Sequence, residues 1–145
     1  MIDEINFTVP GDPVPKGRPK FTTVNGRAKA YTPKKTKHYE EVITVFAKMA
    51  MRGAAPLAGP VSVKIGIFLA IPASWSKKKK EMALVGDVLP TKKPDADNVT
   101  KACFDGMNGI VFIDDAQIVE SFQKKAYSLE PRVEIQVLTL AGKSA

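Results

Sequence analysis

Two pairs of carboxylates stand close together in the middle of the chain. Asp95 and Asp97 lie two residues apart, and Asp114 and Asp115 follow after a segment typical of a short helix and a tight return. Magnesium usually takes one or two carboxylates from a protein, together with water and substrate phosphate oxygens. We therefore expect the two pairs to converge on one metal site, with the ligands Asp95, Asp97, Asp114 and Asp115.

Lysines flank the first carboxylate pair. Lys92 and Lys93 precede it, and Lys101 lies one helical turn beyond Asp97 on the same face. A cation held by carboxylates, with lysines beside it, suits a phosphodiester, because the charge that grows on the phosphate during hydrolysis must be neutralised. The combination predicts metal-assisted phosphodiester chemistry.

The same acids also have purely structural explanations. Asp97 is an acceptable helix N-cap and can form an i,i+4 pair with Lys101, together worth about 1–2 kcal/mol. Asp114 and Asp115 can form a turn before a strand. Neither explanation accounts for acids at both ends of one helix-and-return unit, so the metal site is favoured while the alternative stays open.

A long basic segment lies in the first quarter of the chain. Between Val14 and His38 there are eight lysines and arginines and no acid, and the chain carries a net charge of +7. The bases at positions 16, 18 and 20 alternate along an extended stretch, and Asn25-Gly26 predicts a hairpin that carries two more. Such a segment suits a polyanion. The predicted DNA-binding residues are Lys16, Arg18, Lys20, Arg27, Lys29, Lys92 and Lys93.

Apolar periodicity predicts three helices. The first has an apolar stripe over residues 39–50, with Thr32 or Thr36 as its candidate N-cap. The second is a short lysine-rich helix over about residues 77–85. The third joins the two carboxylate pairs and ends at Asn108-Gly109. A loop over residues 86–94 separates the second helix from the third.

Alternating apolar residues predict strands over residues 2–9, 61–71, 117–127 and 132–140. The last two look like antiparallel neighbours joined by a turn at Glu130-Pro131. Together with the hairpin, these segments predict a mixed sheet of about five strands with about three helices. The expected fold class is α/β, or mixed α+β.

Length and composition limit the class of protein. A chain of 145 residues predicts a single domain, residues 1–145, with a real hydrophobic core. No apolar run approaches the roughly 20 residues that span a bilayer, and the N-terminus does not have the pattern of a secretory signal. The single cysteine excludes an internal disulfide and fits a reducing compartment. We expect a cytoplasmic protein without a membrane partner.

Three further residues are of types that can act in catalysis or binding, but they are interpreted as structural or surface residues. Cys103 shares a helix face with Val99 and Met107, opposite the carboxylates, so we predict a buried thiol rather than a nucleophile. Trp75 is interpreted as a packing residue, with base stacking as the alternative. His38, the only histidine, is interpreted as a surface or packing residue.

The central segment reads Asp95-Ala96-Asp97-Asn98-Val99-Thr100-Lys101 and continues, after an interval, as Asp114-Asp115-Ala116-Gln117. Together with residues 13–19 and 74–77, this pattern resembles the RusA family of Holliday junction resolvases, and in particular its phage-type members. The likeness runs from the first predicted strand to the last. It therefore implies a RusA-like fold for the whole chain.

The resemblance also implies roles for individual residues. The family's catalytic residues fall on Asp95, Asp97, Lys101 and Asp115, with Asp114 as a further metal-site acid. Some members have a basic residue at the position of Pro94, so the residue that makes that DNA contact stays open. Phe104 would lie where it could wedge between bases at the crossover, although core packing is the favoured interpretation.

The activity implied by the resemblance is magnesium-dependent resolution of four-way DNA junctions, in recombination and repair, with manganese able to substitute. A homodimer would nick two symmetry-related strands, in the cytoplasm of a bacterium or of a phage-infected host cell. Two alternatives stay open. One is a nuclease that acts on flaps or forks, and the other is a non-catalytic DNA-binding module in which the acids serve as caps and turns.

Overall fold

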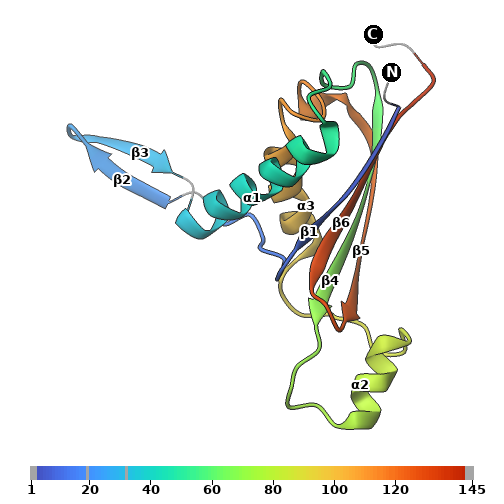
Figure 1. The fold of residues 1–145 in the computed structure, drawn as a ribbon. Coiled ribbons are helices and arrows are strands. Elements are labelled where there is room, and N and C mark those ends of the chain that lie inside the picture. Colours follow the sequence, from blue (N-terminus) through green and yellow to red (C-terminus); the bar gives the residue numbers. More distant parts are fainter. Residues whose placement is uncertain (1–2, 19, 32, 143–145) are drawn as a thin grey trace.

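The computed structural model describes residues 3–18, 20–31 and 33–142. Its elements form one α+β domain with a four-stranded mixed sheet (Figure 1). In chain order they are β1 (Glu4–Pro10), β2 (Lys20–Val24), β3 (Arg27–Tyr31), α1 (Lys34–Met51), β4 (Val61–Ala70), α2 (Lys77–Leu84), α3 (Ala96–Met107), the 3-10 turn η1 (Asp115–Gln117), β5 (Ile118–Ser128) and β6 (Arg132–Thr139). The expected fold class is confirmed.

The order of the strands differs from the prediction. The sheet runs β1-β6-β4-β5, so β4 lies between β5 and β6, which are therefore not neighbours. Strand β4 pairs in parallel with β5 and antiparallel with β6. The first three residues of β4, Val61, Ser62 and Val63, are buried on both faces, and a central position in the sheet provides that burial.

Helices α1 and α3 cover one face of the sheet and enclose the core (Figure 1). The apolar stripe of α1 delivers Ile43 and Ala47 to this core, and α3 delivers Val99 and Cys103. Burial raises the pKa of the Cys103 thiol to about 12, so it is protonated at neutral pH. The prediction of a buried, inert cysteine is confirmed. Phe104 is half-buried and packs against the same core, as the favoured interpretation predicted.

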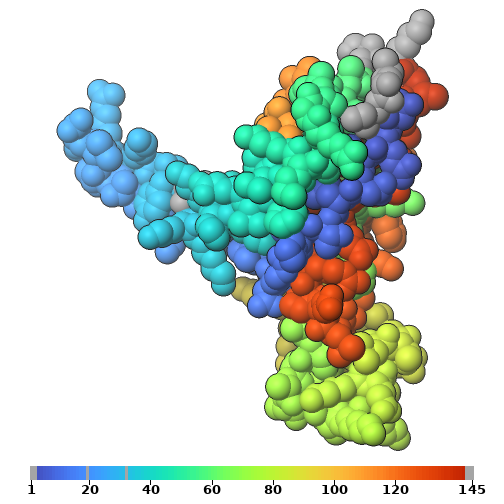
Figure 2. Space-filling view, in the orientation of Figure 1, coloured from blue at the N-terminus to red at the C-terminus, as the bar shows by residue number. Residues whose placement is uncertain are grey.

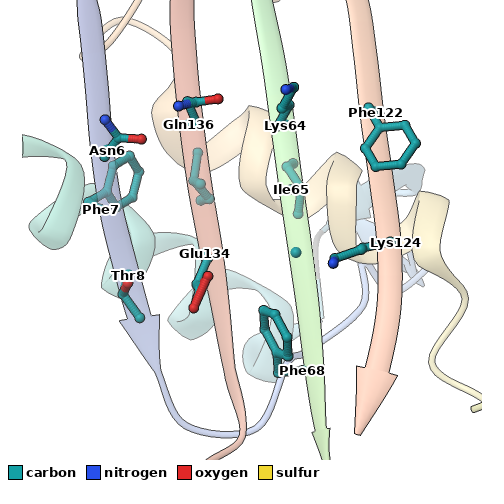
Figure 3. A pocket seen from close by; sticks show the side chains of 12 residues that line it. Asn6, Phe7, Thr8, Lys64, Ile65, Phe68, Phe122, Lys124, Glu134 and Gln136 are labelled. Carbon is teal, nitrogen blue, oxygen red and sulfur yellow. The ribbon is translucent and has the colours of Figure 1, made fainter. Parts of the chain in front are cut away.

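The opposite face of the sheet carries no helix in the described part of the chain (Figure 1), and Figure 3 shows side chains on it from close by. A shallow depression of about 760 Å³ lies on it, lined by basic, acidic and aromatic side chains. Lys64, Lys124 and Glu134 surround this depression, and Phe122 is 59% exposed beside it. This face therefore presents mixed charge, the exposed ring of Phe122 and the partly exposed ring of Phe68 to solvent.

The predicted hairpin is confirmed, although its strands form a separate two-stranded sheet. Asn25 and Gly26 take positive φ angles of 51° and 75°, as a two-residue hairpin turn requires. All described residues of β2 and β3 are exposed, and the ribbon projects away from the body of the molecule (Figures 1 and 2). The main sheet has four strands rather than about five because this pair stays outside it.

Helix α2 forms a lobe beyond the end of β4 (Figures 1 and 2). The hydroxyl of Ser76 caps it by accepting a hydrogen bond from the backbone N–H of Lys79. Trp75 packs edge-on against Tyr127 of β5, with ring centroids 5.1 Å apart. Trp75 therefore packs against the sheet, and this contact ties the lobe to it.

The start of α1 differs from one prediction. The helix begins at Lys34 after Pro33, so Thr36 lies inside it and is not the N-cap. Its buried hydroxyl instead accepts a hydrogen bond from the N–H of Gly17 at 2.9 Å. The other candidate cap, Thr32, lies outside the described residues. Among the helices described, none is long and apolar enough to cross a membrane.

Candidate active site

The first carboxylate pair stands at the N-terminus of α3. Asp95 occupies the N-cap position and Asp97 lies in the first turn, and both side chains are exposed. Asp95 makes no capping hydrogen bond; its side chain accepts one from the amide of Asn98 at 3.5 Å. The proposed explanation of Asp97 as the N-cap is therefore wrong. The helix dipole favours negative charge at this end, which suits two carboxylates held close together.

Lys101 is exposed one turn further along α3. In the described part of the chain no ion pair joins it to Asp97, so the alternative of an i,i+4 pair is not realised. The two carboxylates and the ammonium group thus line one exposed helix end. Because they are exposed, the carboxylates are available to a cation and the ammonium group to a phosphate.

The loop that leads into Asp95 is held by a residue from the sheet. Lys125 of β5 donates hydrogen bonds to the carbonyl oxygens of Lys92 and Pro94, at 2.8 and 3.0 Å. Sequence reasoning missed this residue because nothing in a strand pattern indicates which loop a strand lysine will reach. Lys125 fixes the backbone directly before the first carboxylate.

The second carboxylate pair is built into the turn before β5. The side chain of Asp114 accepts a hydrogen bond from the N–H of Ala116 at 3.3 Å and caps η1. The N–H of Asp115 donates to the side-chain oxygen of Asn108 at 3.0 Å. Asn108 follows the last residue of α3, so this contact places the second pair at the C-terminal end of that helix.

Gln117 anchors the turn on both sides. Its side-chain oxygen accepts hydrogen bonds from the N–H groups of Ile113 and Asp114, at 2.8 and 3.1 Å. Its amide nitrogen donates to the carbonyl oxygens of Leu57 and Gly59, each at 2.9 Å. The glutamine of the Asp-Asp-Ala-Gln motif therefore positions the two acids, a role that the motif alone did not reveal.

The four acids do not converge within one chain. Asp97 is the second residue of α3, and Asp115 is held by Asn108 directly after its last residue, so about 15 Å of helix axis, ten steps from Asp97 to Met107, lies between them. In residues 3–18, 20–31 and 33–142, no three His, Cys, Asp or Glu side chains lie close enough to share a metal ion. Each pair alone still offers two carboxylates, a number that magnesium commonly takes from a protein.

Lys16 lies apart from the other predicted DNA-binding bases. Its ammonium group contacts Glu40 of α1 at 2.6 Å and Asp105 of α3 at 2.9 Å. Partial burial lowers the pKa of Lys16, but the hydrogen bonds to Glu40 and Asp105 outweigh that effect and raise it above 10.5. The structure thus places Lys16 in a network that ties the N-terminal segment to both helices.

The remaining predicted bases are exposed and fall into two groups. Arg18 precedes the hairpin, and the hairpin itself carries three more, Lys20, Arg27 and Lys29. Lys92 and Lys93 lie in the loop directly before the first carboxylate pair. One basic group therefore adjoins the acids, and the other lies on the projecting ribbon.

Comparison with known proteins gives two matches. The family model described as endodeoxyribonuclease RusA matches residues 10–138, a range that contains both carboxylate pairs and Lys101. A protein of Bacillus subtilis (strain 168) with the name uncharacterized protein YqaN is 39% identical over 138 residues. That alignment covers 94% of this chain and 96% of the relative, so the similarity extends over the full fold.

Proposed function

Because this chain belongs to the RusA family of endodeoxyribonucleases, we propose that it resolves four-way DNA junctions by paired, symmetric nicks. The observation that carries the proposal is the exposed group of Asp95, Asp97 and Lys101 on α3, whose side chains form no capping hydrogen bond and no ion pair within the described residues. Junction cleavage would place the protein in recombination and repair, in the cytoplasm of a bacterium or of a phage-infected host cell.

Asp95 and Asp97 would hold magnesium, or manganese in its place. Two carboxylates fit this cation, which keeps its other positions for water and phosphate. Bound there, the metal would supply Lewis-acid activation of the scissile phosphate and of the attacking water. The other side chains then have to place and neutralise the DNA strand.

Lys101 would neutralise negative charge on the phosphate, because its ammonium group lies on the same exposed part of α3. Lys92 and Lys93 would bind the strand where it approaches Asp95, and the bases of the hairpin would bind an arm of the junction. Cys103 is buried and protonated and so is no candidate nucleophile; in this proposal water attacks the phosphate and the cut would be hydrolytic.

A homodimer would supply the second nick and could also unite the two acid pairs. Because α3 holds Asp97 and Asp115 at opposite ends, one metal can be shared between them only if Asp115 comes from a second subunit. A two-fold axis that passes the middle of α3, perpendicular to the helix, would bring each end of α3 beside the opposite end of the same helix in the second subunit. Metal ligands would then be Asp95 and Asp97 of one subunit with Asp114 and Asp115 of the other.

The function is tested by cleavage of a labelled mobile four-way junction with and without magnesium. The parent should make paired symmetric nicks only with the metal, whereas Asp97→Asn should bind without cutting and Asp87→Asn, a change at an exposed acid outside the site, should cut normally. If the parent cut flaps or forks faster than four-way junctions, flaps or forks would be its substrate in place of the junction. Binding by the parent without cutting any branched DNA would indicate a DNA-binding module.

The shared site is tested by mixing two inactive variants. If the acids come from different subunits, mixed dimers of Asp97→Asn and Asp115→Asn contain one site with both changes and one site with neither. Mixing should then restore single nicks at up to about a quarter of the parental rate per subunit, since half of the dimers are mixed. No recovery in dimers that exchange subunits would show that each subunit holds its own complete site.

A further inference from the structure

A second cavity adjoins the first carboxylate pair. It has a volume of about 590 Å³ and lies between the α2 lobe, the ends of β4 and β5, and the loop over residues 88–94. Pro94, one of its lining residues, directly precedes Asp95. A ligand in this cavity would therefore lie next to any phosphate held at the carboxylates.

One wall of the cavity is aromatic and fixed in place. Trp75 and Tyr127 line it as an edge-to-face pair, and both are half-buried. The ammonium group of Lys79 lies 4.0 Å from the centre of a Trp75 ring, which further restricts the indole. Leu89 also lines the cavity and is 57% exposed, so apolar surface faces solvent there.

The charge of the cavity is positive. Lys79, Lys92 and Lys93 line it, and Asp12 is its one acid among the described lining residues. Aromatic and apolar walls with several lysines match the two parts of a nucleotide, since bases stack on aromatic side chains while cations hold the backbone. An apolar ligand without a phosphate would leave the lysines unexplained.

We propose that this cavity binds an unstacked base of the DNA strand whose phosphate lies at Asp95 and Asp97. The inference rests on the proposed function and specifies its substrate further. An enzyme that selects branched DNA must respond to something that continuous duplex does not offer, and a base costs least to unstack where its pairing is already interrupted. The cavity would make cleavage depend on such a base beside the scissile phosphate.

Trp75 is the only tryptophan of the chain, so its fluorescence reports on this cavity directly. We would titrate the full-length protein, without magnesium, with a short oligothymidylate and with an abasic strand of equal length and charge. The strand with bases should quench Trp75 saturably, and the abasic strand should not. Equal quenching by both strands, or no saturable quenching by the strand with bases, would overturn the proposal.

A variant at an exposed position avoids the risk of misfolding. Leu89→Ser should weaken binding of the oligothymidylate by about fivefold or more, because the base loses apolar contact area, and leave binding of the abasic strand unchanged. Tyr127→Leu should weaken the quenching as well, with circular dichroism to confirm its fold. If the parent and Leu89→Ser bound the oligothymidylate with equal affinity, the proposal that the cavity binds a base would be overturned.

Cleavage assays separate this inference from the proposed function. If the parent cuts junctions equally fast with and without a base next to the scissile phosphate, the cavity is not a base site although the nuclease assignment stands. If bases quench Trp75 but no branched DNA is cut, the base site stands and the nuclease assignment fails.

Discussion

The ammonium group of Lys125 lies 3.0 Å from the carbonyl oxygen of Pro94, the residue directly before Asp95. Strand β5 therefore holds the loop that leads into Asp95 by a hydrogen bond from a charged donor. Such a hydrogen bond is stronger than one from a neutral donor. The sheet thus restrains the loop that orients the candidate metal ligands and also lines the neighbouring cavity.

Replacement of Lys125 by Met should reduce junction cleavage by about 10- to 100-fold, the range found for groups that orient metal ligands. Because Lys125 positions the loop and does not contact the phosphate, the magnesium concentration for half-maximal cleavage should rise while DNA binding stays nearly constant. Partial rescue by Lys125→Arg and normal cleavage by Lys124→Met, its exposed neighbour, are the controls. A drop in DNA affinity without a change in magnesium dependence would contradict this role.

Replacement of Gln117 by Leu should destabilise the protein by about 2–4 kcal/mol, since it removes four hydrogen bonds at about 1 kcal/mol each. Urea unfolding followed by circular dichroism measures this change. Gln136→Leu is a matched control that removes one exposed hydrogen bond, to Glu4, and should cost less than about 1 kcal/mol. Equal effects of the two changes would show that Gln117 does not anchor the turn.

Gly106 of α3 lies directly against α1. A Cβ atom there would lie 2.7 Å from Ile43 side-chain atoms and 3.0 Å from the carbonyl oxygen of Glu40. Gly106→Ala should therefore destabilise the fold by about 1–3 kcal/mol, although alanine is the better helix former. In an Ile43→Ala background, which lacks the Cγ2 atom of this contact, the added cost of Gly106→Ala should be smaller, and strict additivity in the double-mutant cycle would contradict the close approach.

Lys16→Met should lower the free energy of unfolding by about 1 kcal/mol at pH 7, because Glu40 and Asp105 lose their shared partner. The pKa of Lys16 is raised in the folded state, so its contribution is fully present below pH 10.5 and disappears as the pH rises through the raised value. The parent and the variant should thus converge in stability at strongly alkaline pH. A constant difference across that range would refute the ion-pair explanation.

The hairpin bases should govern the salt dependence of DNA binding. Removal of one lysine or arginine that binds a phosphate lowers the slope of log affinity against log salt by about 0.9, so Arg27→Ala with Lys29→Ala should lower it by about 1.8. Lys48→Ala, a change at an exposed base on α1, serves as the control and should leave the slope unchanged. An unchanged slope in the double variant would mean that the ribbon does not bind the backbone.

Local patterns in the sequence were sufficient for most elements of the fold. The apolar stripe of α1, the alternation in β4 and the Asn25-Gly26 turn follow from backbone preferences and burial over a few residues. The end of α3 at Asn108-Gly109 was predicted for the same reason, and the carboxylates and Lys101 were found through a short motif. Each of these elements and the motif is determined by residues that lie close together in the sequence.

Only the tertiary structure decided which distant residues meet. The sequence predicted β5 and β6 as neighbours, but β4 lies between them and pairs with both. It predicted that the four acids converge, but α3 is a rigid spacer that holds the pairs apart. It assigned Lys16 to DNA and gave Lys125 no role, because a flexible lysine side chain takes whichever acceptors the packed helices and loops bring within its reach.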